Sequence, residues 1–179
     1  MGWVRWAAPS AIVVSLAAPA HAVRYLSVEQ AQKLAFPDAT RFVEAHVIFT
    51  PAQAAAIERR SGQKVRAGGQ QVWRALAAGD RLVGFFIVDY VIGKHLVIDY
   101  SVGLDPGGRV GRVEILEYRE SYGGEVANRS WLNQFVGKTS GDPLELDQDI
   151  RNLSGATLSS RHVTEGIKRL LALYETCLK

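Results

Sequence analysis

The middle of the chain alternates between apolar runs of strand length and short polar turns. The runs are rich in valine, isoleucine and aromatic residues, which favour strands. Glycine, aspartate and proline cluster between them, as they do in turns. Connections this short join antiparallel neighbours, because parallel strands need a long crossover. The pattern therefore predicts an antiparallel sheet with strands over residues 72–77, 82–92, 96–104 and 110–118.

Helical patterns lie on both sides of these strands. Ser27, followed three residues later by glutamine, has the spacing of a capping box and predicts a short helix over residues 27–35. Thr50 followed by Pro51 predicts a second helix, which Gly62 ends. After residue 160, apolar residues recur at intervals of three and four, the period of an amphipathic helix. These apolar positions are Val163, Ile167, Leu170, Leu171 and Tyr174.

Together the patterns predict an α+β fold, a single domain in which an antiparallel sheet is flanked by helices. We expect this domain to span residues 23–179, with a helical N-terminal part up to about residue 66. No internal repeat, low-complexity tract or linker in the sequence divides it.

Composition excludes some classes of protein. The 179 residues are 47% hydrophobic and 22% charged, which is typical of a folded globular chain. A formal net charge of +3 is too small to indicate a nucleic-acid partner. The single cysteine, Cys177, lies three residues after Tyr174 on the apolar side of the last predicted helix. We interpret it as a small buried side chain rather than a redox thiol.

Candidate metal ligands are widely scattered. His46, His95 and His162 stand far apart in the sequence without the spacing of a metal site, so no metal is expected. His162 is expected to face solvent or cap the helix. An acidic run before the last helix is interpreted as a solvated loop, and its members are Asp142, Glu145, Asp147 and Asp149.

The first 22 residues have the pattern of a secretory signal peptide. Arg5 precedes an apolar run from Ala7 to Ala18, and Ala20-His21-Ala22 has the form of a cleavage site. The run is shorter than the roughly 20 apolar residues of a membrane span. We therefore expect a periplasmic or other extracytoplasmic location, with an uncleaved membrane anchor as the alternative.

A hydroxyl-rich turn, residues 154–160, stands directly before the last predicted helix. Four of its seven residues carry hydroxyls, and Gly155 and Ala156 leave the backbone beside Thr157 sterically open. Backbone N–H groups at the start of a helix, together with the helix dipole, favour a bound phosphate. The same composition is also typical of an ordinary helix N-cap. The residues alone leave both interpretations open.

Residues 152–164 read Asn-Leu-Ser-Gly-Ala-Thr-Leu-Ser-Ser-Arg-His-Val-Thr. This stretch resembles the attachment motif of the FMN-binding domain family, which includes RnfG of the Rnf electron-transport complex, NqrC of the sodium-translocating NADH:quinone reductase and small exported FMN-binding proteins. The resemblance implies that Thr157 carries FMN through a phosphoester bond. It also implies a separate FAD-dependent, magnesium-requiring flavin transferase that attaches the FMN. The cofactor-binding positions that it implies around Thr157 are Ser154, Gly155, Ala156, Leu158 and Ser159.

A second segment, residues 117–135, resembles the family more loosely. The resemblance places this segment beside the flavin and adds Glu120, Ser121 and Trp131 to the expected cofactor site. An isoalloxazine ring favours a flat apolar face. Ordinary core packing is the alternative interpretation of the aromatic residues that could supply that face, which are Tyr118, Tyr122, Trp131 and Phe135.

The leading hypothesis is an exported electron-transfer flavoprotein with covalent FMN and a soluble or membrane-bound redox partner. The chain shows no convergent acid–base pair, which favours an electron carrier over a stand-alone enzyme. The family pattern has aspartate where this chain has Arg151. That departure motivates the alternative of a binding or structural component of a membrane redox complex without flavin. A third hypothesis is an oxidoreductase acting on a small molecule beside the flavin.

Overall fold

The computed structural model describes residues 22–179. Except for Ala22, the signal-peptide prediction therefore lies outside the described residues. One six-stranded sheet forms the centre, with every neighbouring pair antiparallel, in the order β1-β6-β5-β4-β3-β2. The strands are β1 (Val23–Arg24), β2 (Arg41–Val47), β3 (Gln70–Leu76), β4 (Leu82–Ile92), β5 (Val97–Leu104) and β6 (Val110–Tyr118).

Four α-helices accompany the sheet in the described part of the chain: α1 (Val28–Ala35), α2 (Pro51–Ser61), α3 (Arg129–Leu132) and α4 (Thr157–Leu173). Ser27 and Thr50 each form the full capping box with a glutamine three residues later. Gly62 ends α2 with a φ of 71°, a left-handed conformation that glycine adopts without strain. The predicted α+β class, with an antiparallel sheet flanked by helices in a single domain, is confirmed.

The N-terminal part is not wholly helical up to residue 66. Strand β2 lies between α1 and α2, and β1 precedes α1. Strand β2 was not predicted because it is an edge strand with most of its residues exposed, so it lacks the apolar alternation of a half-buried strand. Helix α4 also begins at Thr157, about one turn earlier than the apolar pattern indicates.

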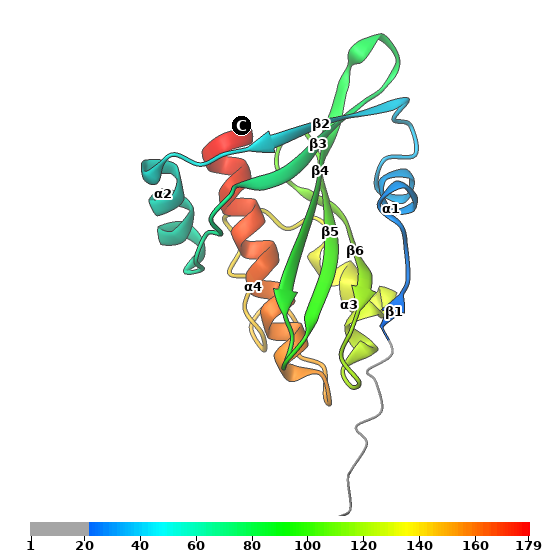
Figure 1. Ribbon diagram of the computed structural model, residues 1–179, viewed down its shortest axis with the longest axis vertical. Helices are drawn as coiled ribbons and strands as arrows, with labels where there is room; N and C mark the ends of the chain where they lie inside the picture. The colour runs from blue at the N-terminus through cyan, green and yellow to red at the C-terminus, as the bar shows by residue number, and fades with distance from the viewer. Residues whose placement is uncertain (1–21) are drawn as a thin grey trace, which may run out of the picture.

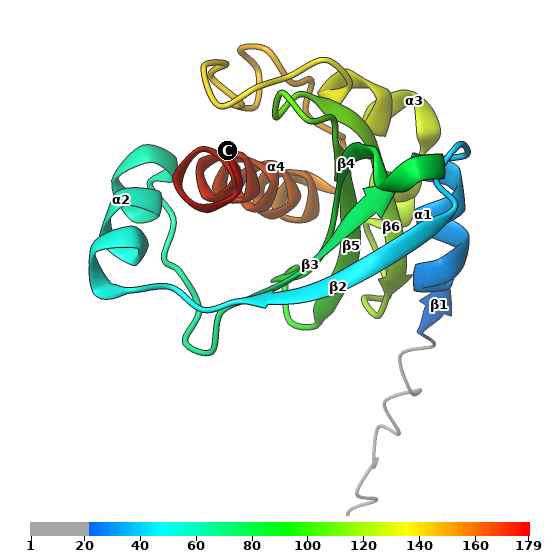
Figure 2. The ribbon, with the colours of Figure 1, turned by 90° about the horizontal axis from the view of Figure 1, so that it is seen from above.

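The helices cover both faces of the sheet (Figures 1 and 2). In the view from above, α4 lies against one face with α2 beyond it, and α1 lies on the opposite face. The main apolar core lies between the sheet, α4 and the segment that contains α3. A smaller cluster under α1 contains Ala31, Trp73, Phe86 and Leu116. No helix within residues 22–179 has the length and apolar character needed to cross a membrane.

A buried ionic cluster joins the sheet to α4, and we call it the Asp89 cluster. The Asp89 side chain is fully buried in β4 and accepts hydrogen bonds from Tyr100 Oη at 2.7 Å and from the guanidinium of Arg169 at 2.6 Å. Arg66, from the segment before β3, forms an ion pair with the other Asp89 oxygen. Burial, and then the Asp89 charge, raise the pKa of Tyr100 well above its usual value. A Cβ atom at Gly166 would stand 2.3 Å from Tyr100 Oη, so the close approach of α4 requires glycine there.

Candidate functional site

Thr157 is the first residue of α4, a helix that begins at the lower end of the molecule in Figure 1. The N-cap residue before it is Ala156, whose side chain has no group to bond the free N–H groups of the first turn. Thr157 is exposed, and its hydroxyl makes no hydrogen bond within residues 22–179. An open hydroxyl therefore stands beside a helix start that has no side-chain cap.

The other hydroxyls of the turn divide into two groups. Ser159 and Ser160 are buried, and their Oγ atoms lie 3.1 Å from Tyr118 Oη and 2.9 Å from Asn152 Oδ1. They fix the start of α4 against the sheet and the preceding loop, so they are not free to bind a ligand. Ser154 is exposed, like Thr157. The open hydroxyls of the turn are thus those of Ser154 and Thr157.

Two loops from the sheet converge on this end of α4 (Figure 1). The Glu120 carboxylate, in the loop after β6, accepts hydrogen bonds from the backbone N–H groups of His95 and Leu96 in the β4–β5 turn. His162 Nδ1 lies 2.6 Å from the carbonyl oxygen of Ile92 and ties α4 to the same turn. His162 therefore bonds the sheet rather than capping its own helix. The expected cofactor residue Glu120 acts here as a clamp between two loops.

This clamp makes a testable contribution to stability. Burial alone would raise the pKa of the Glu120 carboxyl, but the N–H donors of His95 and Leu96 lower it below the ordinary 4.5. A lowered folded-state pKa stabilises the protein above pH 4.5, and this contribution is lost as the pH falls through the folded value. We expect Glu120→Gln to lower the free energy of unfolding by about 1 kcal/mol at pH 7.

Urea unfolding of both proteins at pH 7 and pH 3 measures this effect. The difference in the free energy of unfolding between the native protein and the Glu120→Gln variant should be smaller at pH 3, because Glu120 of the native protein is also losing its charge there. A difference of the same size at both pH values would mean that the Glu120 charge does not hold the two loops together.

The predicted aromatic surface is largely inside the protein. Trp131 is 3% exposed and Phe135 is fully buried, with their ring centroids 5.2 Å apart in an edge-on arrangement. Tyr118 is also buried, and burial is the main cause that raises its pKa. Tyr122, by contrast, is 86% exposed. The alternative interpretation, ordinary core packing, therefore describes Tyr118, Trp131 and Phe135, and only Tyr122 among the four rings offers an open face.

The backbone of Arg151, which stands where the family pattern has aspartate, is hydrogen-bonded through both its N–H and its carbonyl group. Its N–H donates to Gln134 Oε1 at 2.8 Å, and its carbonyl oxygen accepts a hydrogen bond from Trp131 Nε1 at 2.8 Å. Both bonds involve main-chain atoms that any residue would supply. The Arg151 residue is exposed. The Arg151 side chain adds a longer hydrogen bond, from Nε to the same Gln134 oxygen at 3.5 Å.

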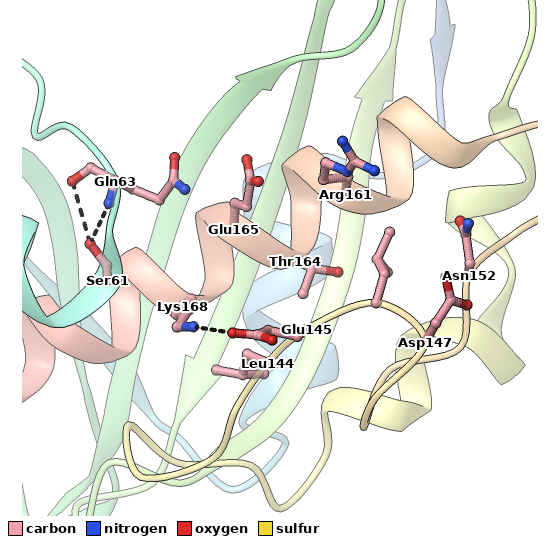
Figure 3. A pocket seen from close by; sticks show the side chains of 11 residues that line it. Ser61, Gln63, Leu144, Glu145, Asp147, Asn152, Arg161, Thr164, Glu165 and Lys168 are labelled. Carbon is pink, nitrogen blue, oxygen red and sulfur yellow. Dashed lines mark hydrogen bonds and ion pairs between the residues drawn. The ribbon is translucent and has the colours of Figure 1, made fainter.

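A polar groove of about 430 Å³ runs along α4 beyond Arg161 (Figure 3). An ion pair between Lys168 and Glu145, with an N–O distance of 3.5 Å, crosses it. Arg161 lies one helical turn after Thr157, so the groove begins close to the open hydroxyl. The other residues of the lining are Ser61, Gln63, Leu144, Leu146, Asp147, Asn152, Thr164 and Glu165.

Two further expectations change in the structure. The acidic run is more than a solvated loop, because Asp149 forms an ion pair with Lys138 at 2.7 Å and accepts the N–H of Glu145. Although burial opposes the change, these contacts lower the pKa of Asp149.

Cys177 is only half-buried beside the cluster of Ile57, Ala172 and Leu173, and burial raises the pKa of its thiol.

Sequence reasoning missed three contributors to this end of the molecule. Arg161 was not among the predicted site residues, although its position four residues after Thr157 places it on the same helix face. The role of Asn152 in holding Ser160 depends on loop geometry that has no sequence pattern. The β4–β5 turn joins the site through Glu120 and His162, which are distant from it in sequence.

Comparisons with known proteins give a family, a relative and a similar solved structure. The family model of the FMN-binding domain matches residues 93–172, from the β4–β5 turn to α4. The G subunit of the proton-translocating ferredoxin:NAD(+) oxidoreductase complex of Clostridium ljungdahlii is 26% identical over 111 residues, which are 58% of this chain. The match spans 60% of the length of that curated relative.

The crystal structure of Shewanella oneidensis NqrC has a similar fold. The TM-score is 0.54 at 16% sequence identity, and the match covers 79% of this chain and 83% of that chain. At this identity the likeness concerns the fold alone. The family model, by contrast, supports FMN binding directly. The resemblance to the FMN-binding domain family is therefore confirmed, with residues 93–172 forming the part of the chain that matches it.

Proposed function

We propose that this protein is an exported electron-transfer flavoprotein whose FMN is covalently attached to Thr157 through a phosphoester bond. The observation that carries the proposal is the position of the Thr157 hydroxyl. It is exposed and without a hydrogen-bond partner within residues 22–179, and it stands at the start of a 17-residue helix whose N-cap side chain bonds nothing. The motif resemblance and the family match over residues 93–172 support a flavin at this end of the molecule.

The surrounding residues fit a phosphoester. Backbone N–H groups in the first turn of α4 would bind the phosphate oxygens, and the positive end of the helix dipole favours their negative charge. Arg161 stands one turn further along the helix with an exposed side chain. FMN would supply the capacity to accept and release electrons. Ser159 and Ser160 would hold the attachment point still, because both are buried and hydrogen-bonded.

Covalent attachment would keep the flavin bound to an exported protein. A flavin held by noncovalent contacts is lost by dilution outside the cell membrane, whereas a tethered flavin keeps a high effective concentration at its site. The proposal of export depends on the signal-peptide pattern in residues 1–22. Maturation would require an FAD-dependent, magnesium-requiring flavin transferase, and function would require a soluble or membrane-bound redox partner.

The relative from C. ljungdahlii is named as a component of an oxidoreductase complex. We therefore include membership of a membrane redox complex in the proposal. The binding or structural component without flavin remains the competing function, because Arg151 stands where the family has aspartate.

The test is to produce the protein together with a flavin transferase and to measure the intact mass after denaturation. We expect the mass to rise by one FMN less one water. Unmodified mass beside a transferase that labels a control substrate would overturn the proposal. If Arg151→Asp were then labelled, the chain would be the binding or structural component.

A further inference from the structure

We propose that Tyr118 is the positioning residue of the attachment site: its hydroxyl group holds the first turn of α4 in the orientation that presents Thr157 to FAD. This inference rests on the proposed function, since it concerns how the same threonine receives its flavin. Tyr118 acts through Ser159, which lies two residues after Thr157. We call the hydrogen-bonded chain of Ser159, Tyr118 and Tyr122 the Tyr118 relay.

The donors and acceptors of the Tyr118 relay follow from the groups present. Tyr118 Oη is hydrogen-bonded to the carbonyl oxygen of Tyr122 and lies 3.1 Å from Ser159 Oγ. A carbonyl oxygen only accepts, so the Tyr118 hydroxyl donates to Tyr122 and accepts from the hydroxyl of Ser159. Burial raises the pKa of Tyr118 above its usual value, so the hydroxyl keeps its proton at neutral pH. The relay therefore runs in one direction, from the first turn of α4 to the loop after β6.

The sheet fixes the centre of the relay. Tyr118 is the last residue of β6 and pairs with Val23 of β1 on one side and Ile98 of β5 on the other. Its ring is 2% exposed and belongs to the main apolar core. Figure 1 shows the end of β6 and the start of α4 at the same end of the molecule. Tyr118 is therefore a rigid point to which the start of α4 is attached.

The first turn of α4 has few other attachments. Its N-cap residue provides no side-chain hydrogen bond. Ser160 binds Asn152, which holds the turn to the preceding loop rather than to the sheet. His162 reaches the sheet only in the next turn of the helix. Among the hydrogen bonds of the first turn within residues 22–179, the bond from Ser159 to Tyr118 is the one that reaches the sheet.

The relay is closely packed on its loop side. Gly123, in the loop after β6, has a φ of 91°. A Cβ atom at this position would stand 2.6 Å from Tyr118 Oη and 3.2 Å from Ser159 Oγ. The loop, the end of β6 and the start of α4 therefore meet at the Tyr118 hydroxyl, and its loss would loosen the turn that carries Thr157.

Attachment requires a defined position of the Thr157 hydroxyl. Its Oγ forms a bond to the flavin-side phosphorus of FAD, the phosphoanhydride bond at that phosphorus breaks, AMP leaves, and the hydroxyl proton passes to water. Such a displacement is fast only when the reacting atoms are held in line, and a misplacement of about 1 Å can cost about a hundredfold in rate. A turn that moves more freely would therefore be labelled more slowly, even if the transferase still bound it.

The test compares Tyr118→Phe with a matched control, Tyr174→Phe. Tyr174 is also 2% exposed, and its hydroxyl also donates to a backbone carbonyl oxygen, that of Pro106 at 2.6 Å. It lies at the opposite end of α4. Each variant keeps its ring and loses the tyrosine hydroxyl, so we expect similar, small losses of global stability.

The first measurement is the steady-state rate of flavin attachment with purified transferase, FAD and Mg²⁺. We expect Tyr118→Phe to lower kcat about tenfold with an unchanged KM for the protein, and Tyr174→Phe to behave like the native protein. Ser159→Ala should lower kcat to a similar extent. The double variant Tyr118→Phe/Ser159→Ala should be no slower than either single variant, because the two hydroxyls act through one bond. Equal kcat values for Tyr118→Phe and Tyr174→Phe, or additive losses in the double variant, would overturn the proposal.

The second measurement needs no flavin. Amide hydrogen exchange of the protein made without transferase reports local opening of the turn. The N–H of Ser160 donates to Ala156 O at 2.8 Å. We expect this amide to exchange about tenfold faster in Tyr118→Phe and at the native rate in Tyr174→Phe. The same exchange rate in both variants would show that the hydroxyl does not fix the turn.

Together the two measurements separate this inference from the proposed function. If the native protein accepted no flavin but Ser160 exchanged faster in Tyr118→Phe, the flavoprotein assignment would be lost, and with it the presentation of Thr157 to FAD, while the relay itself would stand. If Tyr118→Phe were labelled at the native rate, the positioning role would be lost and the flavoprotein assignment would stand.

Discussion

Replacing Thr157 with valine is expected to abolish covalent flavin attachment completely. Valine has the size of threonine but has no hydroxyl to form the phosphoester. The neighbouring hydroxyls of Ser159 and Ser160 are buried and hydrogen-bonded, so they are not expected to replace it. The measurement is intact mass, supported by flavin fluorescence of the denatured protein band, after production with a flavin transferase.

Ser154→Ala is the matched control, because Ser154 is the other exposed hydroxyl of the turn. We expect this variant to be labelled like the native protein. Both variants should change the free energy of unfolding by no more than about 0.5 kcal/mol, as is usual for exposed positions. If the Thr157 variant still carried flavin and the Ser154 variant did not, the attachment site would be Ser154.

Asp89→Ala is expected to destabilise the protein by about 3–5 kcal/mol, since removing one partner of a buried ion pair leaves uncompensated charge. The Asp89 side chain is fully buried. It forms ion pairs with Arg66 and Arg169 and accepts a hydrogen bond from Tyr100. The side chain of Arg169 is only 12% exposed, so water does not replace the lost carboxylate. Urea unfolding at pH 7 gives the change in the free energy of unfolding.

Asp99→Ala is the control for this second prediction. Asp99 also lies in the sheet and forms an ion pair with Arg119 at 2.8 Å, but its side chain is 29% exposed. Partly exposed pairs contribute little, so we expect a loss below about 1 kcal/mol. Equal losses for the two variants would mean that burial does not decide the strength of the Asp89 cluster.

The predictable parts of the fold are those with strong local patterns. The strands from β3 to β6 follow apolar runs separated by turn residues, and Ser27 and Thr50 indicate their helices through capping boxes. Strand β2 lacked such a signal because its pairing with β3 leaves most of its side chains exposed. An edge strand of this kind is specified by its neighbour more than by its own pattern.

The candidate site was predictable only where a continuous motif carries it. The turn from Ser154 to Ser160 indicated Thr157, and the structure places that residue at the uncapped start of a helix. The burial of Trp131 was not predictable, because an aromatic residue looks the same in sequence whether it covers a ligand or fills a core. Asp89 interrupts an apolar strand, which is the kind of signal that indicates a buried polar network.

The Asp89 cluster has a consequence for the order in which the chain can assemble. Arg169 belongs to α4, which follows all six strands in the chain, whereas Asp89 and Tyr100 lie in the middle of the sheet. Until α4 arrives, the carboxylate lacks Arg169 and one side of the sheet lacks its cover. Pairings over such long sequence separations form late. A nascent chain would therefore stay loosely folded until α4 has been synthesised, which suits the export proposed above, since an exported chain passes through a translocation channel before it folds.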